Sequence, residues 1–182
     1  MTSEALARLA DEYWQAHLAA HPISATGFGE RDFDPYLDDR SPAGLAAQQA
    51  RLTDLLARLR SLPPGAEPAT ETTRAALIDQ LECDLAELAC NLDDWTVDPL
   101  EGPQVMAFNI ESFQPIRSVA EGRDMVERWR RLGPWLDQHA ANLRRGLAAG
   151  RVAVRSPVAR VVTTLDGVLA RADDDWALLN PI

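Results

Sequence analysis

Apolar residues recur every three to four positions along most of the chain, which is the spacing that lines one face of an α-helix. One clear example is the run Leu52, Leu55, Leu56 and Leu59. Strict apolar and polar alternation, the mark of a half-buried strand, is nearly absent. The pattern predicts an all-α fold: an irregular, mostly antiparallel bundle of about six helices, near residues 3–20, 42–61, 71–95, 119–132, 134–149 and 157–170.

Helix ends are marked by proline and by capping residues. Pro22 ends the first helix, and Ser41–Pro42 supplies an N-cap with proline at the first helical position of the second. Ser118 followed by Glu121 forms a capping box for the fourth helix. Gly133–Pro134 predicts a break before the fifth helix.

Two connections interrupt the helical pattern. Residues 22–41 are rich in glycine and aspartate, which predicts an ordered loop with local turns. Residues 98–117 contain three prolines and no sustained period, yet are too apolar for a solvated tether, so we expect an irregular connection packed across the bundle. We interpret residues 1–182 as a single helical domain. Residues 171–182 lack a closing element, which suggests the N-terminal lobe of a larger protein.

Composition narrows the class of function. The chain has 182 residues and a formal net charge of -10, a balance that repels a phosphate backbone and excludes ordinary nucleic-acid binding. No secretion signal and no apolar run of roughly 20 residues is present, so we expect a cytoplasmic protein without a membrane segment. Cys83 and Cys90 are too far apart on one helix for a disulfide and are expected to be free thiols.

Two histidines have the spacing of metal ligands on a helix. His17 and His21 are four positions apart, as zinc ligands on one helical face are. The glutamate that a zincin helix carries after its first histidine is missing, and Pro22 follows His21 at once. A hydrogen-bonded core histidine is therefore the favoured interpretation of His17, and no metal ligand is assigned. A helical metal carrier that uses both histidines stays as a third hypothesis.

Aspartates gather in the loop before the second helix. Asp32, Asp34, Asp38 and Asp39 have oxygens of the kind that hard cations prefer, but they lack the order of a calcium-binding loop. Turn and cap duties are the commoner roles for such residues. If the loop contacts a ligand, Asp34 and Asp38 are the predicted substrate-binding residues. No phosphate loop, CxxC pair or nucleophile elbow occurs, so no catalytic residue is assigned.

Several short segments, in order, resemble one bacterial family. They begin with Tyr13–Trp14 and with Pro22, Ala25–Thr26, Gly29, Asp34 and Leu37 through Ser41–Pro42. They continue with Gly102–Gln104, Pro115–Arg117, Trp129–Leu132, Leu143–Arg144, Gly146, Gly150–Arg151 and Val161–Asp166. The chain is identified on these residues as the N-terminal third of a member of the bacterial domain-of-unknown-function family 885.

The resemblance implies a function that the residues alone do not. Full-length members look like helical, zinc-peptidase-like proteins whose His-Glu metal motif lies later in the chain. It follows that this chain is a non-catalytic lobe of a metal-dependent hydrolase, walling a substrate groove completed by a C-terminal part. The resemblance implies zinc for the full-length parent and none for this chain, and it implies that C-terminal part or a peptide-like substrate as the partner. The alternative is a stand-alone helical interaction or dimerisation module, for example a homodimer, with no enzymatic activity.

Overall fold

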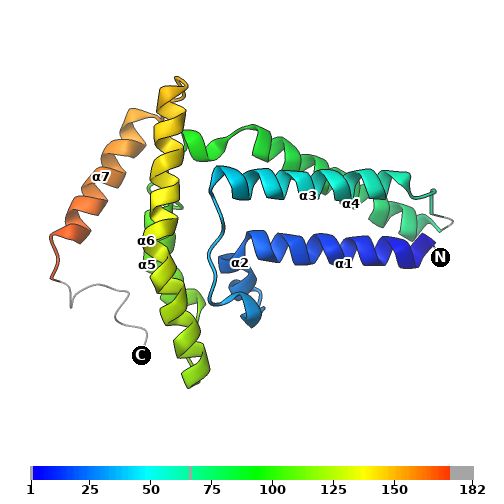
Figure 1. Ribbon diagram of the computed structural model, residues 1–182, viewed down its shortest axis with the longest axis horizontal. Coiled ribbons are helices and arrows are strands. Elements are labelled where there is room, and N and C mark those ends of the chain that lie inside the picture. The colour runs from blue at the N-terminus through cyan, green and yellow to red at the C-terminus, as the bar shows by residue number, and fades with distance from the viewer. Residues whose placement is uncertain (1, 66, 173–182) are drawn as a thin grey trace. The chain divides into compact units, whose positions relative to one another are not determined.

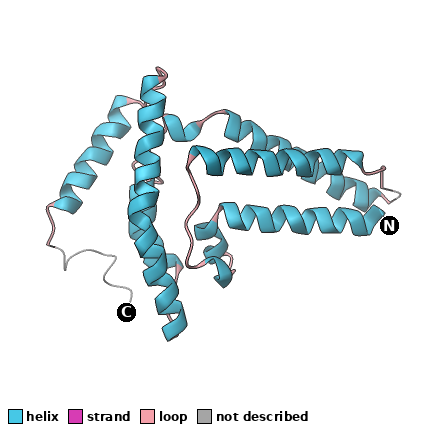
Figure 2. Cartoon of the chain, in the orientation of Figure 1, coloured by secondary structure: helices cyan, strands magenta, loops and turns pink. Residues whose placement is uncertain are grey.

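The computed structural model describes residues 2–65 and 67–172, and throughout these residues the regular structure is helical, without a strand (Figure 2). The all-α prediction is confirmed. The α-helices are α1 (Thr2–Ala20), α2 (Pro22–Gly27), α3 (Pro42–Ser61), α4 (Pro68–Ala89), α5 (Pro103–Phe113), α6 (Val119–Ala148) and α7 (Arg155–Leu169), with 3₁₀ helices η1 (Arg31–Phe33) and η2 (Leu92–Asp94).

The chain divides into two compact units. The first unit comprises Met1–Ala20 and Ser41–Leu92, and the second comprises His21–Arg40 and Asp93–Ile182. Each unit has a hydrophobic core of its own. Among the described residues, no helix is long and apolar enough to cross a membrane.

The first unit consists of α1, α3 and α4, which lie side by side (Figure 1). Its core is built from leucines at helical spacing, as the pattern predicts: Leu6, Leu9, Leu52, Leu55, Leu56, Leu59 and Leu81. The N-cap prediction for α3 is also confirmed, because Ser41 Oγ accepts a hydrogen bond of 3.0 Å from the Gly44 amide. The bounds of α3 coincide with the predicted residues 42–61.

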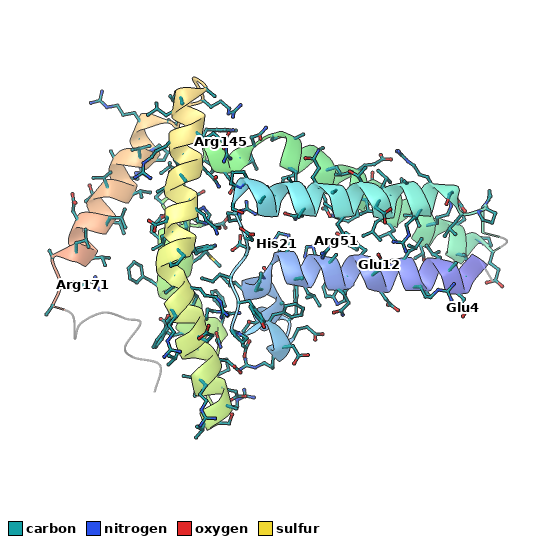
Figure 3. The ribbon with its side chains drawn as sticks, in the orientation of Figure 1. Glu4, Glu12, His21, Arg51, Arg145 and Arg171 are labelled. Atoms are coloured by element: carbon teal, nitrogen blue, oxygen red, sulfur yellow. The ribbon has the colours of Figure 1, made fainter. Side chains whose placement is uncertain are left out.

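Polar contacts between helices fix the outer side of the first unit. Tyr13 donates a hydrogen bond of 2.9 Å to Asp84 Oδ2, joining α1 to α4. Arg58 on α3 forms an ion pair with Glu12 on α1. Arg51, also on α3, is near enough to Glu12 to act on its charge (Figure 3). The pKa of Glu12 lies below its usual value because its carboxylate accepts hydrogen bonds from Arg58.

The end of α4 differs from the predicted helix over residues 71–95. The helix begins at Pro68 and stops at Ala89, and η2 follows after a turn. Asn91 explains the stop, because its φ of 50° lies in the left-handed region that commonly terminates helices. Cys83 and Cys90 are exposed and form no disulfide, as predicted.

The second unit contains more helix than the sequence pattern predicts. The predicted loop at 22–41 contains α2 and η1, and the predicted irregular connection at 98–117 contains α5. Both segments are short, and their prolines occupy the first helical position, where proline is tolerated. Prolines that indicated loops therefore begin helices. The core of this unit comprises Ala107, Ile110, Met125, Leu132 and Trp135.

The predicted break at Gly133–Pro134 does not occur, and α6 is continuous across it. An internal proline removes one hydrogen bond and costs about 3 kcal/mol. Leu132 and Trp135 are both buried on either side of Pro134. Burying each of these two large side chains stabilises the fold by about 1.5–3 kcal/mol. Their burial therefore favours one long helix over two short ones.

The inward face of α6 differs in part from the one that the sequence predicts. The pattern places Val126 and Trp129 inward, and Trp129 does pack against the core of the unit. Val126, however, is 41% exposed, and the fully buried pair is Met125 and Arg128. The cause is chemical. Arg128 and Asn142 occupy buried positions of the true inward face, so the apolar period alone indicates a neighbouring face.

Candidate functional site

The centre of the second unit is the guanidinium of Arg128, which is completely buried. Its Nε donates to the carbonyl oxygen of Tyr36 at 2.9 Å, and Nη1 donates to Gln114 Oε1 at 2.8 Å. Nη2 donates to Thr26 Oγ1 at 2.8 Å and to the carbonyl oxygen of Phe33 at 2.7 Å. The side chain thus connects α6 to α2, to η1 and to the residue after α5.

Burial lowers the pKa of Arg128 to about 10, against the opposing effect of the nearby Asp34 carboxylate. The guanidinium is therefore charged at neutral pH. An arginine in such surroundings must have its donors satisfied, because a buried charge without partners is costly. The loop carbonyls of residues 33 and 36 meet that need, so the charge selects the conformation of the loop.

Asp34 belongs to the same network. It is 1% exposed, and its Oδ1 accepts a hydrogen bond of 2.8 Å from Thr26 Oγ1. Its Oδ2 lies 2.9 Å from Nε of Arg31. Oδ1 therefore accepts a hydrogen bond, whereas the buried Oδ2 has an ion-pair partner but, among the described residues, no hydrogen-bond donor. Asp34 balances the two arginines of the network, and its contact with a substrate stays a prediction.

Asp38 lies in a neighbouring polar cluster. Its Oδ1 accepts a hydrogen bond of 2.7 Å from Trp135 Nε1, and its Oδ2 is 3.4 Å from Arg40 Nε. Arg40 also forms a two-oxygen ion pair with Asp93, at 2.6 and 2.7 Å from Nη2. The Asp38 side chain retains 19% exposure. It is the more accessible of the two predicted substrate contacts, and its role likewise stays a prediction.

His139 lies against this cluster. Its ring packs edge-on to Trp135, with ring centroids 4.6 Å apart. Burial lowers its pKa, and the carboxylates of Asp38 and Asp93 partly oppose that shift. The neutral imidazole is consequently the stable form near neutral pH.

A second buried carboxylate, Asp94, was missed by the sequence reasoning. It is 1% exposed, and its two oxygens are bound by Arg145 on α6 and by Arg151 beyond the end of that helix. Gly146 allows this contact, because a Cβ there would lie 1.8 Å from the Asp94 carbonyl oxygen. The sequence shows Arg145 next to Gly146, but nothing in it indicates that Asp94 is the residue they contact.

The hypothesis of a metal carrier that uses His17 and His21 finds no further ligand among the described residues. His17 stacks on Trp14, with ring centroids 5.6 Å apart, and α1 ends before His21. In the described part of the chain, no group of three or more His, Cys, Asp or Glu residues is placed to hold a metal ion.

These features define a protein that is all-α over its described residues and whose second unit contains buried arginine–carboxylate networks. Residues 22–182 match the family described as bacterial protein of unknown function (DUF885). The chain belongs to this family, as the ordered segments indicated. A comparison with curated proteins found no match.

Proposed function

We propose that this chain is a non-catalytic helical lobe of a metal-dependent, peptidase-like hydrolase. In this proposal a C-terminal part of the protein carries the zinc ligands and the catalytic groups, and the lobe walls one side of the substrate groove. The family membership supplies the context. The observation that carries the proposal is the apolar face that α7 leaves exposed.

Helix α7 has the amphipathic pattern of a helix that packs against a partner. Val161 is buried, but Val162 and Leu169 are 50% and 71% exposed, and Leu165 is also exposed. The helix diverges from α6 after the turn that joins them (Figure 1). An exposed apolar stripe of this kind marks an interaction surface. We assign it to the catalytic part of the same protein.

The buried networks suit a lobe that must keep a groove in shape. Arg128 fixes the loop after α2 from several directions, and Arg40 forms an ion pair with Asp93, which belongs to η2. Hydrogen-bonded polar networks of this type rigidify the elements that they connect. Substrate contact through Asp38, and through Asp34 if Arg31 moves aside, is part of the proposal.

The gene supplies the first test. We expect the reading frame after the codon for Ile182 to continue and to encode a His-Glu metal motif. The encoded C-terminal part, expressed separately, should bind zinc, form a complex with residues 1–182 and hydrolyse a peptide substrate faster in that complex. A reading frame without such a motif overturns the proposal.

A pair of matched variants tests the face of α7. Leu169→Ser should weaken the complex by about 10- to 100-fold, since a buried leucine contributes about 1.5–3 kcal/mol. Leu100→Ser removes a leucine of similar exposure, 79%, outside α7 and should leave the affinity unchanged. If Leu169→Ser instead dissociates a homodimer of residues 1–182 in sedimentation experiments, the stand-alone dimerisation module replaces the lobe.

A further inference from the structure

A groove of about 700 Å³ runs along the first half of α6 and the residues before it. Its apolar surface is formed by Ile116, Val119 and Val126. Val119 is 75% exposed, which is unusual exposure for a valine at the start of a long helix. Gly122 lies between these residues and leaves the groove open, because it has no side chain.

Three arginines border the same groove, namely Arg117, Arg123 and Arg130. On α6 the residues follow the order Val119, Arg123, Val126, Arg130, with spacings of four, three and four. That spacing places all four on one face of the helix. The groove therefore presents apolar and cationic groups alternately along one line.

The charge of the groove is poorly neutralised from within. In the part of the chain that the structure describes, the guanidiniums of Arg117 and Arg123 have no ion-pair partner. Arg130 pairs with Glu127 at 3.2 Å, but its own side chain is 72% exposed, so the pair is weak. Glu121 is occupied by the Arg117 amide and by Arg31. A cationic strip thus lies on a chain whose net charge is -10.

We infer that this groove binds an extended peptide whose carboxylates alternate with apolar side chains. Arginine guanidiniums suit carboxylates, and the valine and isoleucine surface suits the apolar side chains between them. Arg123 and Arg130 are seven residues apart, which is about 10.5 Å along a helix axis. A peptide in the extended polyproline II conformation has three residues per turn and rises about 3.1 Å per residue, so side chains three positions apart lie on one face, about 9 Å from each other. Acidic residues three positions apart therefore match the arginine spacing.

This inference deepens the proposed function. It rests on that proposal only in taking the bound peptide to be a segment of the substrate. Binding itself needs only residues 1–182. Fluorescence anisotropy with a labelled peptide that carries glutamates three positions apart, with leucines between them, tests it directly. A peptide of identical composition with adjacent glutamates tests the spacing, and one with glutamine in place of glutamate tests the charge.

We expect the spaced glutamate peptide to bind best and its affinity to fall with added salt. The double variant Arg123→Gln/Arg130→Gln should weaken it about five- to thirty-fold, the sum of two exposed pairs at the upper end of their usual strength. The matched control Arg144→Gln/Arg160→Gln makes the same change of charge on exposed residues outside the groove. It should leave the affinity within about twofold.

A third variant blocks the groove without weakening the helix. A Cβ at Gly122 would lie 3.7 Å from Ile116 Cγ2, an ordinary contact, so a side chain is tolerated there. Gly122→Leu should fill the groove and abolish peptide binding, while leucine favours helix more than glycine does. An unchanged circular dichroism spectrum and melting temperature would separate blocking from misfolding.

Several results would overturn the inference. Equal binding of the glutamine peptide, or equal losses in both arginine pairs, would show that the groove does not recognise carboxylates. Binding to vesicles of anionic lipid without binding to the peptide would assign the strip to a membrane surface instead. If the peptide binds but the complete protein hydrolyses no peptide, the proposed function fails and the groove stands. If hydrolysis occurs and the groove variants leave its KM unchanged, the groove fails alone.

Discussion

Replacement of Arg128 by methionine is the sharpest test of the buried network. Methionine fills much of the volume of the arginine stem but removes the charge and every hydrogen bond to Thr26, Gln114 and the loop carbonyls. Each buried acceptor left without a donor costs about 1–3 kcal/mol. Asp34 would also keep only Arg31 as a neighbouring cation. Breaking a buried pair in this way costs about 3–5 kcal/mol.

The assay is urea unfolding followed by tryptophan fluorescence, with amide hydrogen exchange to assign the loss to the second unit. A loss of 3–5 kcal/mol corresponds to a fall of about 6–20 °C in melting temperature for a chain of this size. Arg130→Met is the matched control, because it removes an exposed arginine two residues further along α6. It should cost less than about 0.5 kcal/mol.

The conservative variant Arg128→Lys separates charge from geometry. Lysine keeps the positive charge but has three donors on one atom instead of a planar fork, so it cannot reach the separate acceptors together. Its stability should fall between those of the parent chain and Arg128→Met. If Arg128→Met and Arg130→Met differ by less than about 1 kcal/mol, the network does not stabilise the second unit and the reasoning is refuted.

Three further substitutions have defined outcomes. Gly146→Ala should cost at least about 1–3 kcal/mol in urea unfolding, because its Cβ would collide with the Asp94 carbonyl oxygen, and a neutral result would refute the close approach. Tyr13→Phe should cost about 1 kcal/mol by the same assay, since it removes the hydrogen bond to Asp84, whereas a larger loss would indicate a packing role. The lowered pKa of His139 means that the unfolded state binds the proton more readily, so its contribution to stability is present above the unfolded pKa of about 6.5 and is lost as the pH falls below it. His139→Gln should flatten the dependence of the urea midpoint on pH in that range, and an unchanged slope would contradict the assignment.

The first unit could be predicted almost completely, because its core follows the leucine spacing. Leu52, Leu55, Leu56 and Leu59 are all buried, and the Ser41 cap begins the helix where the sequence placed it. In such a unit the hydrophobic period and the packing agree, so local pattern is enough. The membership of the chain in its family was predictable for a different reason, since it rests on the order of short segments rather than on any one of them.

The second unit was harder to predict because polar residues occupy its interior. Arg128 is a strongly hydrophilic residue, and a period counted on apolar residues passes over it. Its partners are loop carbonyls and a glutamine, groups whose positions depend on the fold itself. Asp94 could not be predicted for the same reason. Its burial depends on ion pairs with two arginines that are distant in the sequence.

The partial error in the face of α6 shows what signal could have been used. Met125, Arg128, Leu132 and Trp135 share a helical face, and Asn142 and Gly146 continue it. When Arg128 is counted as a core residue, this face becomes the most regular stripe of the helix, and Val119, Arg123, Val126 and Arg130 fall on another one. The second stripe then has no role in the core of the unit. A valine and arginine stripe left exposed for that reason is the surface for which the peptide proposal provides a partner.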